Sequence, residues 1–99
     1  MDDWPFDDAK NTATLTVRQL VHGGQPILLV FHDADDGMWQ FLTGETVDMS
    51  DAMLVSLESI YRRDPSVGEL ADLPLGWQAS RASRAGRWNR QAFATGECR

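Results

Sequence analysis

Short hydrophobic runs recur through the first half of the chain and predict strands. Residues 12–17 (TATLTV) are rich in β-branched side chains, which favour the pleated backbone of a strand. Residues 27–31 (ILLVF) are hydrophobic without interruption, which indicates a strand covered on both faces and central in its sheet. Residues 38–42 (MWQFL) predict a third strand, with Trp39 and Phe41 on the same face.

Helix signals follow a fourth short hydrophobic run. Residues 52–55 (AMLV) predict a strand that leads into a helix over 57–63, with Ser56 as its N-cap. Asp64 then supplies a second N-cap, and Pro65 occupies the first helical position of another helix. The pattern therefore predicts two successive helical segments.

The last third of the chain returns to strand patterns. Residues 77–81 and 87–90 predict the two strands of a hairpin, and 83–86 has the composition of its turn. Nearer the N-terminus, 18–24 (RQLVHGG) predicts one helical turn or a loop that ends at two glycines. Because the helices are grouped rather than alternating with strands, the order predicts an α+β fold, a largely antiparallel sheet with a helical pair packed on one face.

One small domain is expected, because 99 residues suffice for one modest core. We place the domain at 12–90, after an irregular acidic arm over 1–11 and before a flexible tail over 91–99. Trp4 is an unusual residue for an acidic arm. It is expected either to pack on the domain's own surface or to anchor a partner.

The charge is distributed unevenly between the two halves of the chain. The net charge is −6, and residues 1–58 carry eleven acids against two basic residues, a net −9. An acidic protein repels phosphate backbones, so nucleic acid is an unfavoured partner, and an acidic half favours a basic protein partner. Arginines recur every third residue after position 80 and are expected to pair with the acidic half or stay solvated (Arg81, Arg84, Arg87, Arg90).

Other features bear on compartment and cofactors. The longest hydrophobic run is far shorter than the roughly 20 residues that cross a bilayer, so no membrane partner is expected. The acidic N-terminal residues do not resemble an export signal, and the single cysteine, Cys98, has no partner for a disulfide. A cytoplasmic protein without a cofactor is the expectation.

The segment FHDADDGMWQFL (31–42) contains the densest group of side chains that could bind a metal or act in catalysis. Its acids resemble the start of a calcium loop, but the glycine comes fifth rather than sixth and position 12 is Gly44 rather than glutamate. The favoured interpretation is a hairpin turn in which Gly37 takes a positive φ. The alternative is a metal or small-ligand site built from four side chains, His32, Asp33, Asp35 and Asp36.

No catalytic arrangement is evident in the sequence. His32 and Asp33 are adjacent on a predicted strand and therefore point to opposite faces, which separates an imidazole from the carboxylate that would orient it. Cys98 lies in the predicted tail, Ser56 is assigned to a cap, and no phosphate-binding glycine motif occurs. We therefore predict no catalytic residue, and a binding protein rather than an enzyme.

Two segments carry a family resemblance, HDADDGMWQFLTG (32–44) and RDPSVGELADLPLGWQASR (63–81). Together with WPF (4–6) and LVSL (54–57), they resemble a family of small uncharacterised bacterial proteins. That family is similar to immunity proteins of bacterial toxin systems, small acidic proteins that bind and block a cognate toxin. The resemblance implies a bacterial, cytoplasmic, non-catalytic binding domain and assigns no site residue. Combined with the charge pattern, it predicts protein binding through four residues, Asp33, Asp35, Asp36 and Trp4.

Overall fold

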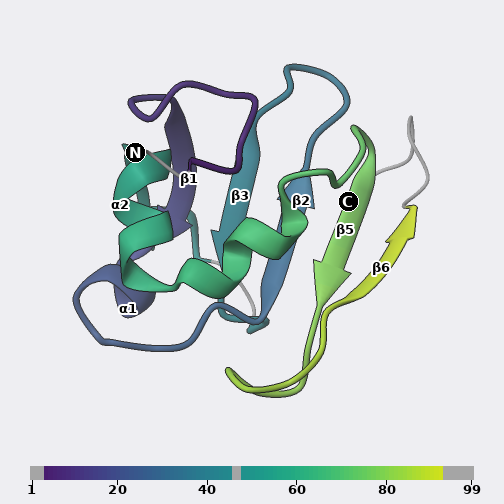
Figure 1. Ribbon diagram of the computed structural model, residues 1–99. Coiled ribbons are helices and arrows are strands. Elements are labelled where there is room, and N and C mark those ends of the chain that lie inside the picture. The colour runs from purple at the N-terminus through teal and green to yellow at the C-terminus, as the bar shows by residue number, and fades with distance from the viewer. Residues whose placement is uncertain (1–3, 46–47, 93–99) are drawn as a thin grey trace.

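The computed structural model describes residues 4–45 and 48–92, which form six strands of one sheet. The strand order across the sheet is β4-β1-β3-β2-β5-β6 (Figure 1). Strands β1 and β3 run parallel, and every other neighbouring pair is antiparallel. The strands are β1 (Ala13–Val17), β2 (Leu29–His32), β3 (Trp39–Leu42), β4 (Ala52–Ser56), β5 (Trp77–Ser80) and β6 (Asn89–Ala92).

Each predicted strand is present, and the α+β fold with a largely antiparallel sheet is confirmed. The hydrophobic run at 27–31 contributes to β2, which lies between β3 and β5 as the expected central strand. The hairpin at the C-terminal end is also present, but β6 begins two residues later than the predicted 87–90. Of the predicted tail, residues 93–99 lie outside the described part of the chain.

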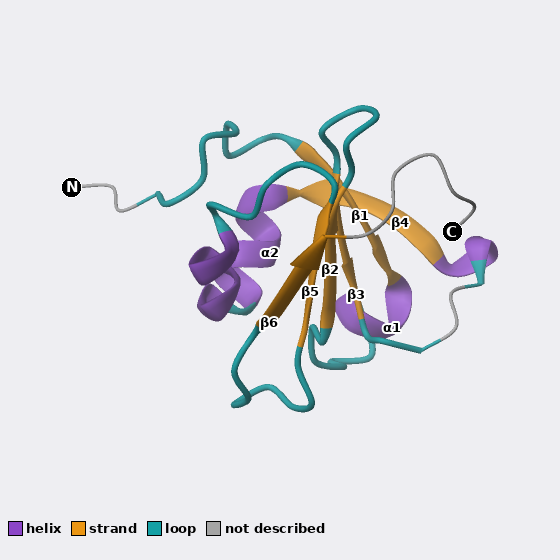
Figure 2. Ribbon diagram, turned by 90° about the vertical axis from the view of Figure 1, so that its right-hand side faces the viewer, coloured by secondary structure: helices purple, strands orange, loops and turns teal. Residues whose placement is uncertain are grey.

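The helix over 57–63 is present as predicted, but the second member of the expected pair is a 3-10 helix. α1 (Arg18–Val21) is a single turn, α2 (Leu57–Arg63) is the longest helix described, and η1 (Met49–Asp51) and η2 (Pro65–Leu70) are 3-10 helices. Figure 2 shows α2 and its neighbouring turn together on one side of the sheet. The predicted pair of α-helices is therefore wrong in its second member, although the predicted caps are correct. Ser56 accepts from the Ser59 backbone N–H (3.1 Å), and Asp64 accepts from that of Ser66 (3.1 Å).

A glycine, Gly68, lies in the middle of η2. A Cβ at Gly68 would lie 2.9 Å from Tyr61 Cε1 and 3.2 Å from Pro5 Cγ. The missing side chain therefore lets η2 pack closely against α2 and the N-terminal arm.

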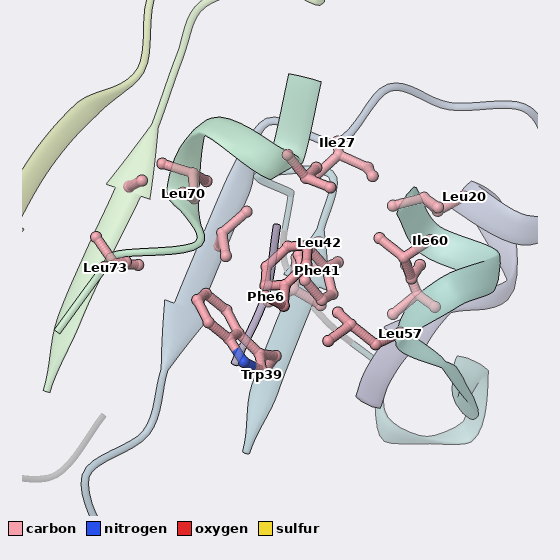
Figure 3. Packing of buried hydrophobic residues seen from close by; sticks show 14 residues of the cluster. Phe6, Leu20, Ile27, Trp39, Phe41, Leu42, Leu57, Ile60, Leu70 and Leu73 are labelled. Carbon is pink, nitrogen blue, oxygen red and sulfur yellow. The ribbon is translucent and has the colours of Figure 1, made fainter. Parts of the chain in front are cut away.

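The core lies between the sheet and the layer of α2 and η2 (Figure 3). Trp39 and Phe41 share a face as predicted, and their rings stack 5.9 Å apart. Phe6 packs edge-on against Trp39 at 5.5 Å and is only 6% exposed. Residues 4–11 form no strand or helix, but Phe6 is part of the core, so the arm is packed into the domain.

Candidate functional site

The acidic segment between β2 and β3 is the turn of a hairpin. Asp33 donates its backbone N–H to the Met38 carbonyl oxygen (2.9 Å), and Gly37 donates to the Asp33 carbonyl oxygen (3.0 Å). The Asp36 carboxylate accepts from the Met38 backbone N–H (2.9 Å), and Gly37 has a φ of 73°. The glycine thus takes the left-handed conformation that the sequence predicts for this turn.

The three aspartates of the turn have different environments. Asp33 is 7% exposed, and its Oδ2 accepts a hydrogen bond from Gln40 Nε2 at 2.6 Å. Asp35 and Asp36 are exposed. The expectation that all three carboxylates form one displayed cluster is therefore wrong for Asp33, because this side chain turns back onto β3. We call the two exposed residues, Asp35 and Asp36, the acidic tip.

His32 belongs to the core side of the sheet rather than to the acidic turn. Its ring stacks on Trp39 with centroids 3.8 Å apart and planes 11° apart. Its Nδ1 lies 2.7 Å from the Leu73 carbonyl oxygen and donates to it, since a carbonyl oxygen only accepts. Asp33 bonds Gln40 on the other face, as strand alternation predicts.

The alternative metal site is not assembled in this structure. Among residues 4–45 and 48–92, no three or more histidine, cysteine, aspartate or glutamate side chains gather closely enough to hold an ion. The four candidates are split between the two faces of the hairpin and its tip (His32, Asp33, Asp35, Asp36). The ligand set proposed from sequence spacing therefore lacks a common centre.

Trp4 packs on the protein's own surface. Its ring lies 5.4 Å from that of Phe6 and 5.5 Å from that of Tyr61, and its Nε1 donates to the Asp8 carbonyl oxygen (2.8 Å). The Asp8 carboxylate accepts from Trp39 Nε1 (2.8 Å), which fixes the arm beside the start of β3. Of the two expectations for Trp4, packing within the domain is the one that the contacts support.

An exposed leucine beside the acidic tip was missed in the sequence. Leu75 is 55% exposed, and its Cδ2 lies 4.0 Å from the position that a Cβ on Gly37 would take. The backbone N–H of Gly76 donates to the His32 carbonyl oxygen (2.7 Å), which holds this loop against the end of β2. Figure 1 shows the arm, the β2–β3 turn and the loop before β5 at the same end of the sheet.

Arg81 is the second residue whose role was missed. Its side chain is 1% exposed and pairs through Nη2 with Asp64 Oδ2 at 2.7 Å. Nη1 donates to Ser66 Oγ (2.9 Å), Nε donates to the Ile27 carbonyl oxygen (3.0 Å), and the guanidinium lies 4.0 Å from the Trp88 ring centroid. A predicted surface arginine thus joins β5 to η2 and to the segment before β2.

The pKa of Asp64 reflects this network. Burial of the carboxyl works to raise its pKa, but hydrogen bonds from Ser66 and Arg81, with the charge of Arg81, outweigh burial and hold the pKa below 3.8. Asp64 is therefore ionised in the folded protein at neutral pH. The carboxylate compensates the buried guanidinium.

Two other arginines of the C-terminal segment also lie beside carboxylates. Arg84 Nε lies 3.9 Å from Asp64 Oδ2, and Arg90 Nη1 lies 2.6 Å from Asp72 Oδ1. The expectation that they pair with the acidic N-terminal half is wrong, because their partners are Asp64 and Asp72. Asp64 and Asp72 thus offset half of the charge of the four arginines, which weakens a nucleic-acid surface in this segment.

Comparisons of the chain with models of protein families, with curated proteins and with solved structures returned no match. No helix within the described ranges is both long enough and apolar enough to cross a membrane.

Proposed function

We propose that this protein is a non-catalytic protein-binding domain that presents the acidic tip to a basic partner. The supporting observation is the uncompensated charge of Asp35 and Asp36. Both side chains are exposed, and no ion pair within the described residues neutralises either of them. Other acids are paired with arginines, namely Asp51, Glu58, Asp64 and Asp72.

Leu75 adds an apolar group to this charged surface. A binding surface usually combines a desolvated apolar anchor with a polar rim, whose charges set the association rate and salt dependence. Leu75 lies next to the turn that carries both aspartates, so the anchor and the charges occupy one continuous surface. Asp33 and Trp4 are not part of this proposal, because both are engaged within the domain.

The charge of the chain and the resemblance to immunity proteins both favour a protein partner. A basic toxin would match the acidic tip in charge, and blocking it requires only tight binding. The partner class in this proposal is therefore a basic bacterial protein, and a toxin is its specific form.

Variants of the acidic tip test the proposal. A partner is first recovered on immobilised wild-type protein, purified, and then measured by surface plasmon resonance against each variant at several salt concentrations. Electrostatic steering changes association rates by factors of about 10 to 1000, so the double variant Asp35→Asn/Asp36→Asn should lower the rate by about tenfold at low salt. Leu75→Ser should instead raise the dissociation rate.

The matched control is Glu45→Gln, which removes an exposed carboxylate beyond the end of β3 that is remote from the turn. Its association rate should stay near that of the wild type. Equal rates for the wild type and the double variant, together with no dependence on salt, would show that the acidic tip is not the binding surface.

A further inference from the structure

Strand β4 forms one margin of the sheet, and its outer edge has no neighbouring strand among the described residues. Figure 2 shows this strand running along the outside of the sheet toward η1. An unpaired strand edge presents backbone N–H and C=O groups that favour pairing with another strand. The question is which strand the edge fits.

The register fixes which backbone groups face outward. Leu57, directly after β4, donates its N–H to the Thr12 carbonyl oxygen (2.8 Å), so its backbone faces β1. Backbone polar groups alternate sides along a strand, so Met53 and Val55 also face β1. The outward-facing residues of the edge are therefore Ala52, Leu54 and Ser56.

The side chains of β4 do nothing to block pairing. The five residues AMLVS contain no charge and no proline, which are the common protections of edge strands. Leu54, at the centre, is 65% exposed, and Met49 just before the strand is 72% exposed. The opposite margin, β6, is protected by contrast, because it carries Arg90, which is bonded to Asp72 and to the Glu69 carbonyl oxygen.

We propose that β4 pairs with β4 of a second copy of this chain, antiparallel about a two-fold axis at Leu54. This arrangement sets Leu54 opposite Leu54 of the second copy, and Ala52 opposite Ser56 of the second copy. Every outward-facing residue of the strand then lies in a pair that exchanges two hydrogen bonds. The pairing is self-complementary, which is what a two-fold interface requires.

The charges near the two ends of β4 are compatible with this approach. Asp51, before the strand, pairs with Arg18 at 2.8 Å, and Glu58, after it, pairs with Arg62 at 3.6 Å. The antiparallel arrangement brings the Asp51–Arg18 pair of one copy near the Glu58–Arg62 pair of the other. Asp51 and Glu58 are therefore neutralised within each copy, whereas Asp48 bonds only Ser50 and belongs to no ion pair among the described residues, so one negative charge remains near that end of the contact.

A single five-residue strand buries less than the roughly 1,200 Å² that standard stable interfaces reach, so the dimer is weak and concentration-dependent. Sedimentation equilibrium from about 10 μM to about 1 mM should show a growing dimer fraction for the wild type. Leu54→Lys, which places a charge on the edge, should stay monomeric. Gln91→Lys is the matched control, since it places the same charge on the opposite edge strand, β6, and should associate like the wild type.

Amide hydrogen exchange on the unmodified protein gives a second, independent test. Protection of the Leu54 N–H should rise with protein concentration, whereas that of the inward-facing Val55 N–H should be high at every concentration. A wild type that stays monomeric at about 1 mM overturns the proposal. So does association of Leu54→Lys, loss of association in Gln91→Lys, or protection at Leu54 that is independent of concentration. This contact uses a different surface from the acidic tip and does not depend on the proposed function.

Discussion

Replacement of Arg81 by methionine should be among the most destabilising single changes in this protein. Methionine retains much of the buried aliphatic volume but removes the guanidinium that bonds Asp64, Ser66 and the Ile27 carbonyl oxygen. The Asp64 carboxylate, whose side chain is 7% exposed, then loses the cation 2.7 Å away.

Removing one partner of a buried ion pair costs about 3 to 5 kcal/mol, because the remaining charge stays buried without compensation. Small domains are stable by only about 5 to 15 kcal/mol, so Arg81→Met should remove a large part of the free energy of unfolding. At about 4 to 8 °C per kcal/mol, the melting temperature should fall by at least about 12 °C.

Urea unfolding followed by circular dichroism measures this change. The control is Arg84→Met, which makes the same substitution at a side chain that is 60% exposed and lies 3.9 Å from the same Asp64 oxygen. An exposed pair contributes at most about 1 kcal/mol, so the two variants should differ by at least about 2 kcal/mol. Equal free energies of unfolding for Arg81→Met and Arg84→Met would refute the assignment of Arg81 as the central contact.

Three further predictions concern stability. Because the pKa of Asp64 is lowered in the fold, its stabilising contribution is complete above pH 3.8 and is lost as the pH falls through the folded-state pKa. The urea midpoint of the wild type should therefore drop in this pH range more than that of Arg81→Met. Equal drops would contradict the pKa argument. Gly37→Ala should cost about 1 to 2 kcal/mol by thermal unfolding, since alanine at a φ of 73° is strained, and an unchanged melting temperature would show that the turn relaxes. Ser56→Ala should cost about 1 kcal/mol in urea unfolding through loss of the cap to Ser59, whereas Ser56→Asp should keep most of it.

The elements could be predicted from the sequence because local signals agree with the tertiary fold. The hydrophobic run at 27–31 became the central strand β2, and the cap at Ser56 begins α2. Strand alternation correctly separated His32 from Asp33, which removed the catalytic interpretation of that pair. These inferences depend on neighbours within a few residues, for which backbone geometry alone is sufficient.

Contacts between distant segments could not be predicted in the same way. The parallel pairing of β1 with β3 depends on how the β2–β3 hairpin docks, which no local pattern encodes. Arg81 belongs to a regular series of arginines that looks solvated, but its partner Asp64 lies 17 residues earlier and in the sequence has the role of a helix cap. The exposed Leu75 next to Gly37 depends on the same kind of long-range proximity.

The arrangement of the ion pairs also connects the two proposed contacts. Arg81, Arg84 and Arg90 are paired with Asp64 and Asp72 rather than with the acidic tip, and the chain as a whole carries a net charge of −6. Two copies of the chain therefore repel each other at long range, although the β4 edges themselves are neutral. Salt screens this repulsion and should strengthen self-association, whereas the same salt should weaken binding of a basic partner to Asp35 and Asp36. Opposite responses to salt thus distinguish the two surfaces in a single titration, because only contacts of opposite net charge lose affinity when charges are screened.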